Sequence, residues 1–239
     1  MSTDEASVER ALSGECIIDT SLLSNFVNTG YAHLLNRLLG GPVFLSPSVL
    51  DDREVVPPLD PPATEPSSEF LRPLYLSQFP RYAAYVPRAT HIRAFALDRG
   101  TTWQPTTPTV SELALASSFG DRRIRTDVRR RCPEVRGRVE LDAGESEAAA
   151  VAVSRGFSFL VDDRAAVNLV RCLYPGVPVL RTCGLLAHAV RKGYLPCDEA
   201  ADLFNRRLAR EMGFYASRKE DGVRQYLQLR CGPPRCVWE

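Results

Sequence analysis

The sequence predicts an α/β fold in which a central parallel sheet lies between two layers of helices. Two observations carry this prediction. From residue 144 onward, short apolar runs alternate with longer helix-like segments, and the same alternation opens the chain at 15–54. This pattern indicates βαβ crossovers, which build parallel sheets with helices on both faces. We therefore expect residues 1–239 to form one domain, a three-layer α/β/α sandwich.

Residues 16–54 predict two short strands, each followed by a helix. The apolar run at 16–18 predicts a buried strand that ends at Asp19, and a helix follows. We expect this helix to break near the Asn-Thr-Gly sequence at 28–30. The run at 43–45 predicts a second short strand, after which a new helix begins within 46–54.

A proline-rich stretch then interrupts the alternation. VVPPLDPPATEPSS (55–68) holds five prolines, which excludes a helix interior or a central strand. The residues after it are rich in aromatic side chains and Arg. We expect 55–110 to be an insertion or lid within the domain, with 101–109 as a connection. Its aromatic and Arg side chains suit either stacking on RNA or packing against the core or a second copy.

The second half of the chain gives the clearest pattern. An alanine-rich segment predicts a helix closed by Gly156. After it we expect strands at 157–161 and 177–180, each followed by a helix, and a last long helix at 197–213.

A basic segment lies between the insertion and this half. Residues 121–138 contain eight Arg against three acids, although the net charge of the chain is only +1. Two interpretations stay open: a solvated helix face with its own ion pairs, or a surface that contacts phosphates.

The cysteines and the N-terminus indicate the cellular compartment of the protein. Seven cysteines at irregular spacings, mostly within apolar or helix-like segments, predict reduced core thiols in a cytoplasmic protein. The polar N-terminus does not resemble a signal peptide, and no apolar run approaches the ~18 residues that span a bilayer.

Acidic residues follow two of the predicted strands. Asp19 ends the first strand, Asp162 and Asp163 end a later one, and Glu145 begins the helix before it. Ligands of open α/β sheets bind beyond the carboxyl ends of the strands. Each acid is also an ordinary residue for a helix N-terminus. The alternatives are therefore local helix capping, or a carboxylate cluster that binds a cation such as Mg²⁺.

The segments IIDTSLL, SPSVLDD, LDAGESEAAAVA, LVDDRAA and VLRTCGLLAHAVRKGYL resemble successive motifs of PIN-domain nucleases. The resemblance covers 16–54 and 139–217, and points to the ribonuclease toxins of prokaryotic toxin–antitoxin pairs. It implies a five-stranded parallel sheet and a Mg²⁺- or Mn²⁺-dependent endoribonuclease with RNA as substrate. It is compatible with a cognate antitoxin protein and a homodimer as partners.

The resemblance also implies roles for individual residues. The implied catalytic residues are Asp19, Asp52, Glu145 and Asp163. The implied metal ligands are Asp19, Glu145, Asp162 and Asp163. The implied substrate contacts are Thr20, Ser21, Arg164, Arg181 and Thr182. Asp52 stands where the family often has Glu, so Asp51, Asp52 and Glu54 remain alternatives for that acid.

Two other functions remain open. The shorter Asp52 side chain and the long insertion favour a module that binds RNA or protein without catalysis. A nuclease acting on structured DNA is the third interpretation, because flap nucleases share PIN-like folds.

Overall fold

The computed structural model describes residues 5–47, 103–133, 135, 139–204, 206 and 208. Within this part of the chain, one sheet contains five strands in the order β3-β2-β1-β4-β5, and every neighbouring pair is parallel. The strands are β1 (Cys16–Ile18), β2 (Val43–Leu45), β3 (Trp103–Pro105), β4 (Ser158–Leu160) and β5 (Val179–Leu180). The predicted parallel α/β sheet is confirmed.

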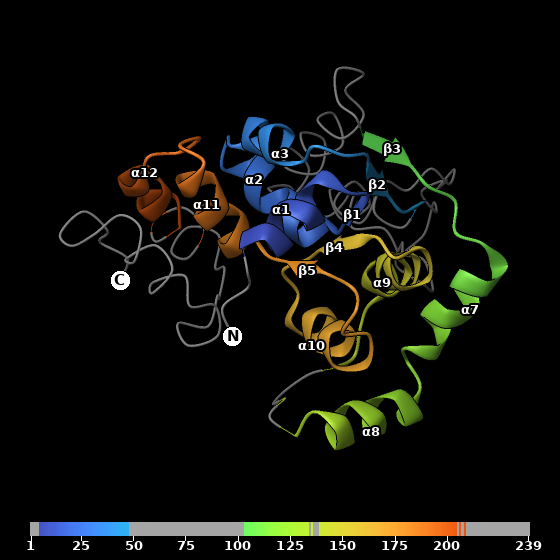
Figure 1. Ribbon diagram of the computed structural model, residues 1–239. Coiled ribbons are helices and arrows are strands. Elements are labelled where there is room, and N and C mark those ends of the chain that lie inside the picture. Colours follow the sequence, from blue (N-terminus) through green and yellow to red (C-terminus); the bar gives the residue numbers. More distant parts are fainter. Residues whose placement is uncertain are drawn as a thin grey trace, which may run out of the picture.

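Helices cover both faces of this sheet (Figure 1). One layer contains α1 (Glu5–Ser13), α2 (Thr20–Asn28), α3 (Ala32–Leu38), α11 (Thr182–Arg191) and α12 (Cys197–Asp202). The other contains α7 (Val110–Ser118), α8 (Arg122–Arg131), α9 (Ala143–Arg155) and α10 (Arg164–Leu173). The three-layer sandwich is therefore confirmed. No helix among the described residues has the length and apolar character needed to cross a membrane.

The central strand β1 shows why its sequence forms this structure. Cys16, Ile17 and Ile18 are all fully buried. Successive side chains of a strand point to opposite faces. Ile17 accordingly packs in the core beneath α9 and α10, whereas Cys16 and Ile18 pack beneath α2 and α3. A strand buried on both faces needs a continuous apolar run, and β1 has one.

The edge strand β3 corrects one expectation. We expected 101–109 to be a connection, but Trp103–Pro105 pairs with β2, with Trp103 opposite Val43. Pro105 is tolerated because the strand lies at the sheet edge. The indole of Trp103 is buried, and its Nε1 donates a hydrogen bond to Asn36 Oδ1 at 3.1 Å. The rest of the expected insertion, 55–102, lies outside the described residues.

The cysteines provide a second correction. Cys132, which follows α8, forms a disulfide with Cys172 in α10, and Cys197 is also disulfide-bonded. The prediction of reduced thiols is therefore wrong for these three residues. It holds for Cys16 and Cys183, which are free and buried. Cys132 and Cys172 are 40 residues apart in the sequence, and only the packing of α8 on α10 brings them together.

Candidate active site

The candidate site lies at the carboxyl ends of the neighbouring strands β1 and β4. Ile18 pairs with Leu160, and the backbone N–H of Asp19 donates to Leu160 O at 2.9 Å. The chain leaves both strands at the same edge of the sheet, where ligands of α/β proteins bind. Residues that follow the two strands are therefore neighbours in space.

Asp19 occupies the centre of this edge. It caps the N-terminus of α2, and its side chain is only 4% exposed. Its Oδ2 accepts hydrogen bonds from Ser21 N at 2.9 Å and Ser21 Oγ at 2.5 Å. Burial raises the pKa of Asp19 to about 6, against the lowering effect of the Ser21 hydrogen bonds, and the charge of Asp142 raises it further. Loss of hydration is thus the dominant influence on this carboxyl.

Asp142 and Glu145 form a capping box at the start of α9. Glu145 N donates to Asp142 Oδ1 at 2.9 Å, and Asp142 N donates to Glu145 Oε2 at 3.1 Å. Each side chain satisfies a backbone N–H that the helix leaves unpaired. The interpretation of these acids as helix-end residues is therefore confirmed. The same capping holds Glu145 in a fixed position at the edge of the sheet.

Glu145 also belongs to a carboxylate cluster. Burial raises its pKa to about 9, and the charges of Asp142, Asp163 and Asp19, in that order, contribute to the rise. Like charges around a carboxyl favour its protonated form. These four acids are called the acidic cluster below. The two interpretations of the acids are thus compatible, because capping residues of three different helices converge in one cluster.

Asp163 is the member of the acidic cluster that lies at the start of α10. It is the N-cap of that helix, and its Oδ1 accepts a hydrogen bond from Ala166 N at 3.0 Å. The side chain is half-buried, and the neighbouring Arg164 is exposed. Asp163 therefore joins the acidic cluster from the segment that follows β4, and its role as a metal ligand stays a prediction.

Asp162 lies in a different environment although it is the adjacent residue. Its Oδ2 accepts a hydrogen bond from Asn25 Nδ2 at 2.8 Å and another from Thr182 Oγ1. Its Oδ1 accepts from Thr182 N at 3.0 Å. Arg181 Nε lies 3.7 Å from Oδ1, and both side chains are buried. Both oxygens of Asp162 are thus engaged by the protein, so we assign it to the structure and not to the expected ligand set.

The five residues expected to contact the substrate also lie in two environments, either buried around Asp162 or near the acidic cluster. Arg181 and Thr182 are buried and contact Asp162, so they hold β4 against α2 and α11. Ser21 Oγ joins the two environments, since it donates to Asp19 and accepts from Asp162 N at 3.2 Å. Thr20 is buried beside it. Of the five expected contacts, only Arg164 is exposed.

The structure adds residues that sequence reasoning did not assign to the site. Asp142 was visible in the sequence, because Asp-x-x-Glu is a capping-box pattern. Asn25 carried no such signal, since only the fold brings it within hydrogen-bonding distance of Asp162. The expected acid Asp52, with its alternatives Asp51 and Glu54, lies outside the described residues.

The acidic cluster fits a hard divalent cation in its chemistry. Carboxylate oxygens are the ligands that Mg²⁺ and Mn²⁺ prefer. After burial, the negative charges of Asp142, Asp163 and Asp19 contribute to the raised pKa of Glu145. Within the described ranges, however, no three His, Cys, Asp or Glu side chains are close enough together to hold one ion. A cation would have to draw the carboxylates together, or bind through water.

Fold and site together define an α/β protein with an acidic cluster at the carboxyl edge of its parallel sheet. In comparisons with known proteins, no family model matches this chain, and no curated protein or solved structure matches it.

Proposed function

We propose that this protein is a Mg²⁺- or Mn²⁺-dependent endoribonuclease that hydrolyses RNA phosphodiester bonds. The observation that carries the proposal is the convergence of Asp19, Glu145 and Asp163 beyond the carboxyl ends of β1 and β4. Burial is the main cause that raises the pKa of Glu145 to about 9, and the charges of Asp142, Asp163 and Asp19 add to the rise. The protein retains these like charges at the edge of the sheet where α/β proteins bind ligands. The motif resemblance to PIN-domain nucleases names the same three residues.

The residues of the chain supply position and charge. Asp19, Glu145 and Asp163 would hold the cation, each kept in place by a hydrogen bond from a helix N-terminus. A bound divalent ion would supply the positive charge that polarises a phosphodiester and activates water. Ser21 orients Asp19 through the 2.5 Å hydrogen bond from its Oγ. The exposed Arg164 is suited to contact a phosphate at the rim.

The biological setting follows from the same resemblance. We propose a cytoplasmic protein related to the toxins of toxin–antitoxin pairs, with an antitoxin protein as its partner. The disulfide between Cys132 and Cys172 gives no support to this location, because disulfides are rare in most cytoplasmic proteins.

Cleavage of labelled single-stranded RNA in Mg²⁺, Mn²⁺ or EDTA tests the activity. We expect cleavage only with a divalent ion, and we expect Asp163→Asn and Glu145→Gln each to abolish it. Asp198→Asn is the matched control, because Asp198 is an exposed acid in the first turn of α12. Undiminished cleavage by both site variants would refute the assignment. Cleavage of a matched DNA strand in preference to RNA would favour a DNA nuclease.

A second function, a binding module without catalysis, is favoured by one observation. No three of the described acidic, His or Cys side chains are placed to share an ion. The raised pKa of Glu145, about 9, favours the protonated carboxyl at neutral pH in the metal-free protein, and a protonated carboxyl is a poor metal ligand. A melting temperature that does not change in millimolar Mg²⁺ or Mn²⁺ would support this function, because a bound ion stabilises the folded state.

A further inference from the structure

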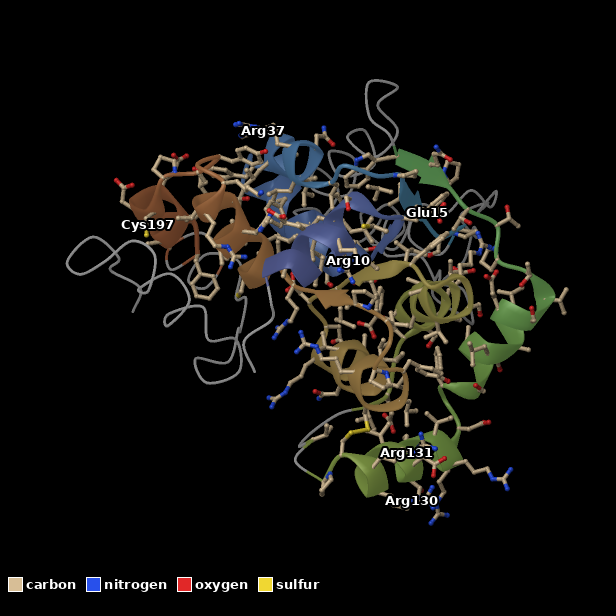
Figure 2. All side chains as sticks on the ribbon, viewed as in Figure 1. Arg10, Glu15, Arg37, Arg130, Arg131 and Cys197 are labelled. Carbon is tan, nitrogen blue, oxygen red and sulfur yellow. A yellow bond between two sulfur atoms is a disulfide. The ribbon has the colours of Figure 1, made fainter. Side chains whose placement is uncertain are left out.

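Helix α8 presents an exposed face of arginine side chains. Val128 is fully buried and anchors the helix to the core beneath α10. On the opposite side of the helix, successive turns bring four exposed residues to one face: Arg122, Arg123, Arg129 and Arg130. These four residues are called the arginine face below. In Figure 2 the labelled Arg130 lies on α8 at the periphery of the molecule.

Most of the positive charge on this face is not neutralised. Arg130 forms an ion pair with Asp127 at 2.9 Å. Arg122, Arg123 and Arg129 form no ion pair with any described residue. Like charges on adjacent turns of a helix destabilise it. The protein therefore retains a repulsive arrangement that an anionic partner would relieve.

The arginine face is fixed relative to the acidic cluster. Arg125 forms an ion pair with Glu140, two residues before Asp142. At the other end of α8, the disulfide between Cys132 and Cys172 attaches the chain to α10. The helix is thus held between the segment that enters α9 and the far end of α10, whose N-cap is Asp163.

We propose that the arginine face binds the phosphodiester backbone of the RNA that the acidic cluster cleaves. The proposal rests on the endoribonuclease function and adds a substrate-binding surface outside the cluster. Arg122 and Arg129 are seven residues apart, so their Cα atoms are about 10 Å apart along the helix. Each guanidinium can make two parallel hydrogen bonds to a phosphate.

The composition of the face favours a nucleic acid over an acidic protein. Protein interfaces have a core of aromatic and apolar side chains inside a polar rim. The only other residue at the centre of the arginine face is Thr126, which is exposed. Phosphate contacts require no such core, because the release of counterions drives binding.

Salt-dependent RNA binding tests the proposal without cleavage. Binding of a fluorescein-labelled single-stranded RNA is measured by anisotropy in EDTA at several salt concentrations. The slope of log K against log salt is negative, and each lost phosphate contact lowers its magnitude by about 0.7. We expect Arg122→Ala with Arg129→Ala to lower it by about 1.4. At about 1 M salt the two phosphate contacts contribute little to affinity, so wild type and variant should bind equally there. At about 0.1 M salt, one decade lower, the variant should then bind about 25-fold more weakly than wild type.

The control removes the same charge elsewhere. Arg10 and Arg37 are exposed on α1 and α3, away from α8 (Figure 2). We expect Arg10→Ala with Arg37→Ala to leave the slope near the wild-type value. Replacing Arg122 and Arg129 by Lys keeps the charge and the helix, and should retain most of the slope. Circular dichroism confirms that every variant is folded.

The outcomes separate this proposal from the nuclease assignment. A wild-type slope in the Arg122→Ala, Arg129→Ala variant would overturn the proposal even if the protein cleaves RNA, and would leave an acidic protein as the partner of this face. An equal loss in the Arg10→Ala, Arg37→Ala control would also overturn it. A loss confined to α8 supports it even where no cleavage is observed, since binding is measured without divalent ion.

Discussion

Replacing Glu145 by Gln should stabilise the metal-free protein at neutral pH. In the unfolded chain the carboxyl ionises at its ordinary pKa of 4.5, whereas burial and three neighbouring carboxylates raise the pKa to about 9 in the fold. The folded state therefore binds a proton that the unfolded state has released. Because the folded pKa is raised, stability is lost as pH increases from about 4.5 towards 9.

The size of the effect follows from the width of this interval. Between pH 4.5 and pH 7 the folded protein must retain the proton over about 2.5 pH units, at about 1.36 kcal/mol each, so the upper limit is about 3 kcal/mol. Glu145 remains partly exposed, and solvent screening reduces the value to about 1–3 kcal/mol. Gln keeps the oxygen that accepts from Asp142 N, so the capping box survives the substitution.

Urea unfolding in EDTA at pH 4.5, 7 and 8.5 measures this prediction. We expect the Glu145→Gln variant to be more stable than wild type at pH 7 and 8.5, and equal to it at pH 4.5. Mg²⁺ or Mn²⁺ should then stabilise the wild type more than the variant. Glu15→Gln is the control, because Glu15 is exposed, and it should change stability by less than about 0.5 kcal/mol. A Glu145→Gln variant less stable than wild type at pH 7 would contradict the reasoning.

Two further predictions concern contacts outside the acidic cluster. Replacing Cys132 and Cys172 by Ser removes a cross-link between residues 40 apart, and should lower the free energy of unfolding by up to about 4 kcal/mol under oxidising conditions. Equal unfolding midpoints of wild type and variant under those conditions would exclude the disulfide. Glu112 is 3% exposed and accepts from Arg155 Nε at 2.7 Å, which lowers its pKa to about 2. Glu112→Gln should therefore cost about 3 kcal/mol at pH 7, a difference that disappears as pH falls from 4.5 towards 2; a difference independent of pH would contradict it.

Most of the fold could be predicted because its local signals agree with its packing. The central strands are apolar runs followed by helix caps, and Gly156 ends α9 in the left-handed conformation, with φ 72°. The edge strand β3 escaped prediction because it has three residues, one of them Pro105. The segment is a strand because its backbone pairs with β2, and its own sequence shows no strand pattern. Helix α1 was not predicted either, since its sequence is mostly polar; among its residues 8–13, Val8, Ala11 and Leu12 are buried.

Long-range contacts account for what the sequence could not reveal about the cysteines and the site. No local pattern connects Cys132 with Cys172, or Asn25 with Asp162, which are 137 residues apart. Sequence reasoning did place Asp19 and Asp163 at one edge of the sheet, because each follows a strand and parallel topology aligns the strand ends. The position of Glu145, which begins a helix, depended on the fold.

The adjacent acids Asp162 and Asp163 show the limit of this reasoning. Successive side chains at the end of a strand point in different directions, so only one of the two can face the edge of the sheet. Asp162 points into the core, where Asn25 and Thr182 engage its oxygens. Asp163 turns outward and caps α10. The sequence offers both residues as ligands, but the direction of each side chain depends on where β4 ends. Asp162 therefore fixes the end of the strand from which Asp163 reaches the acidic cluster.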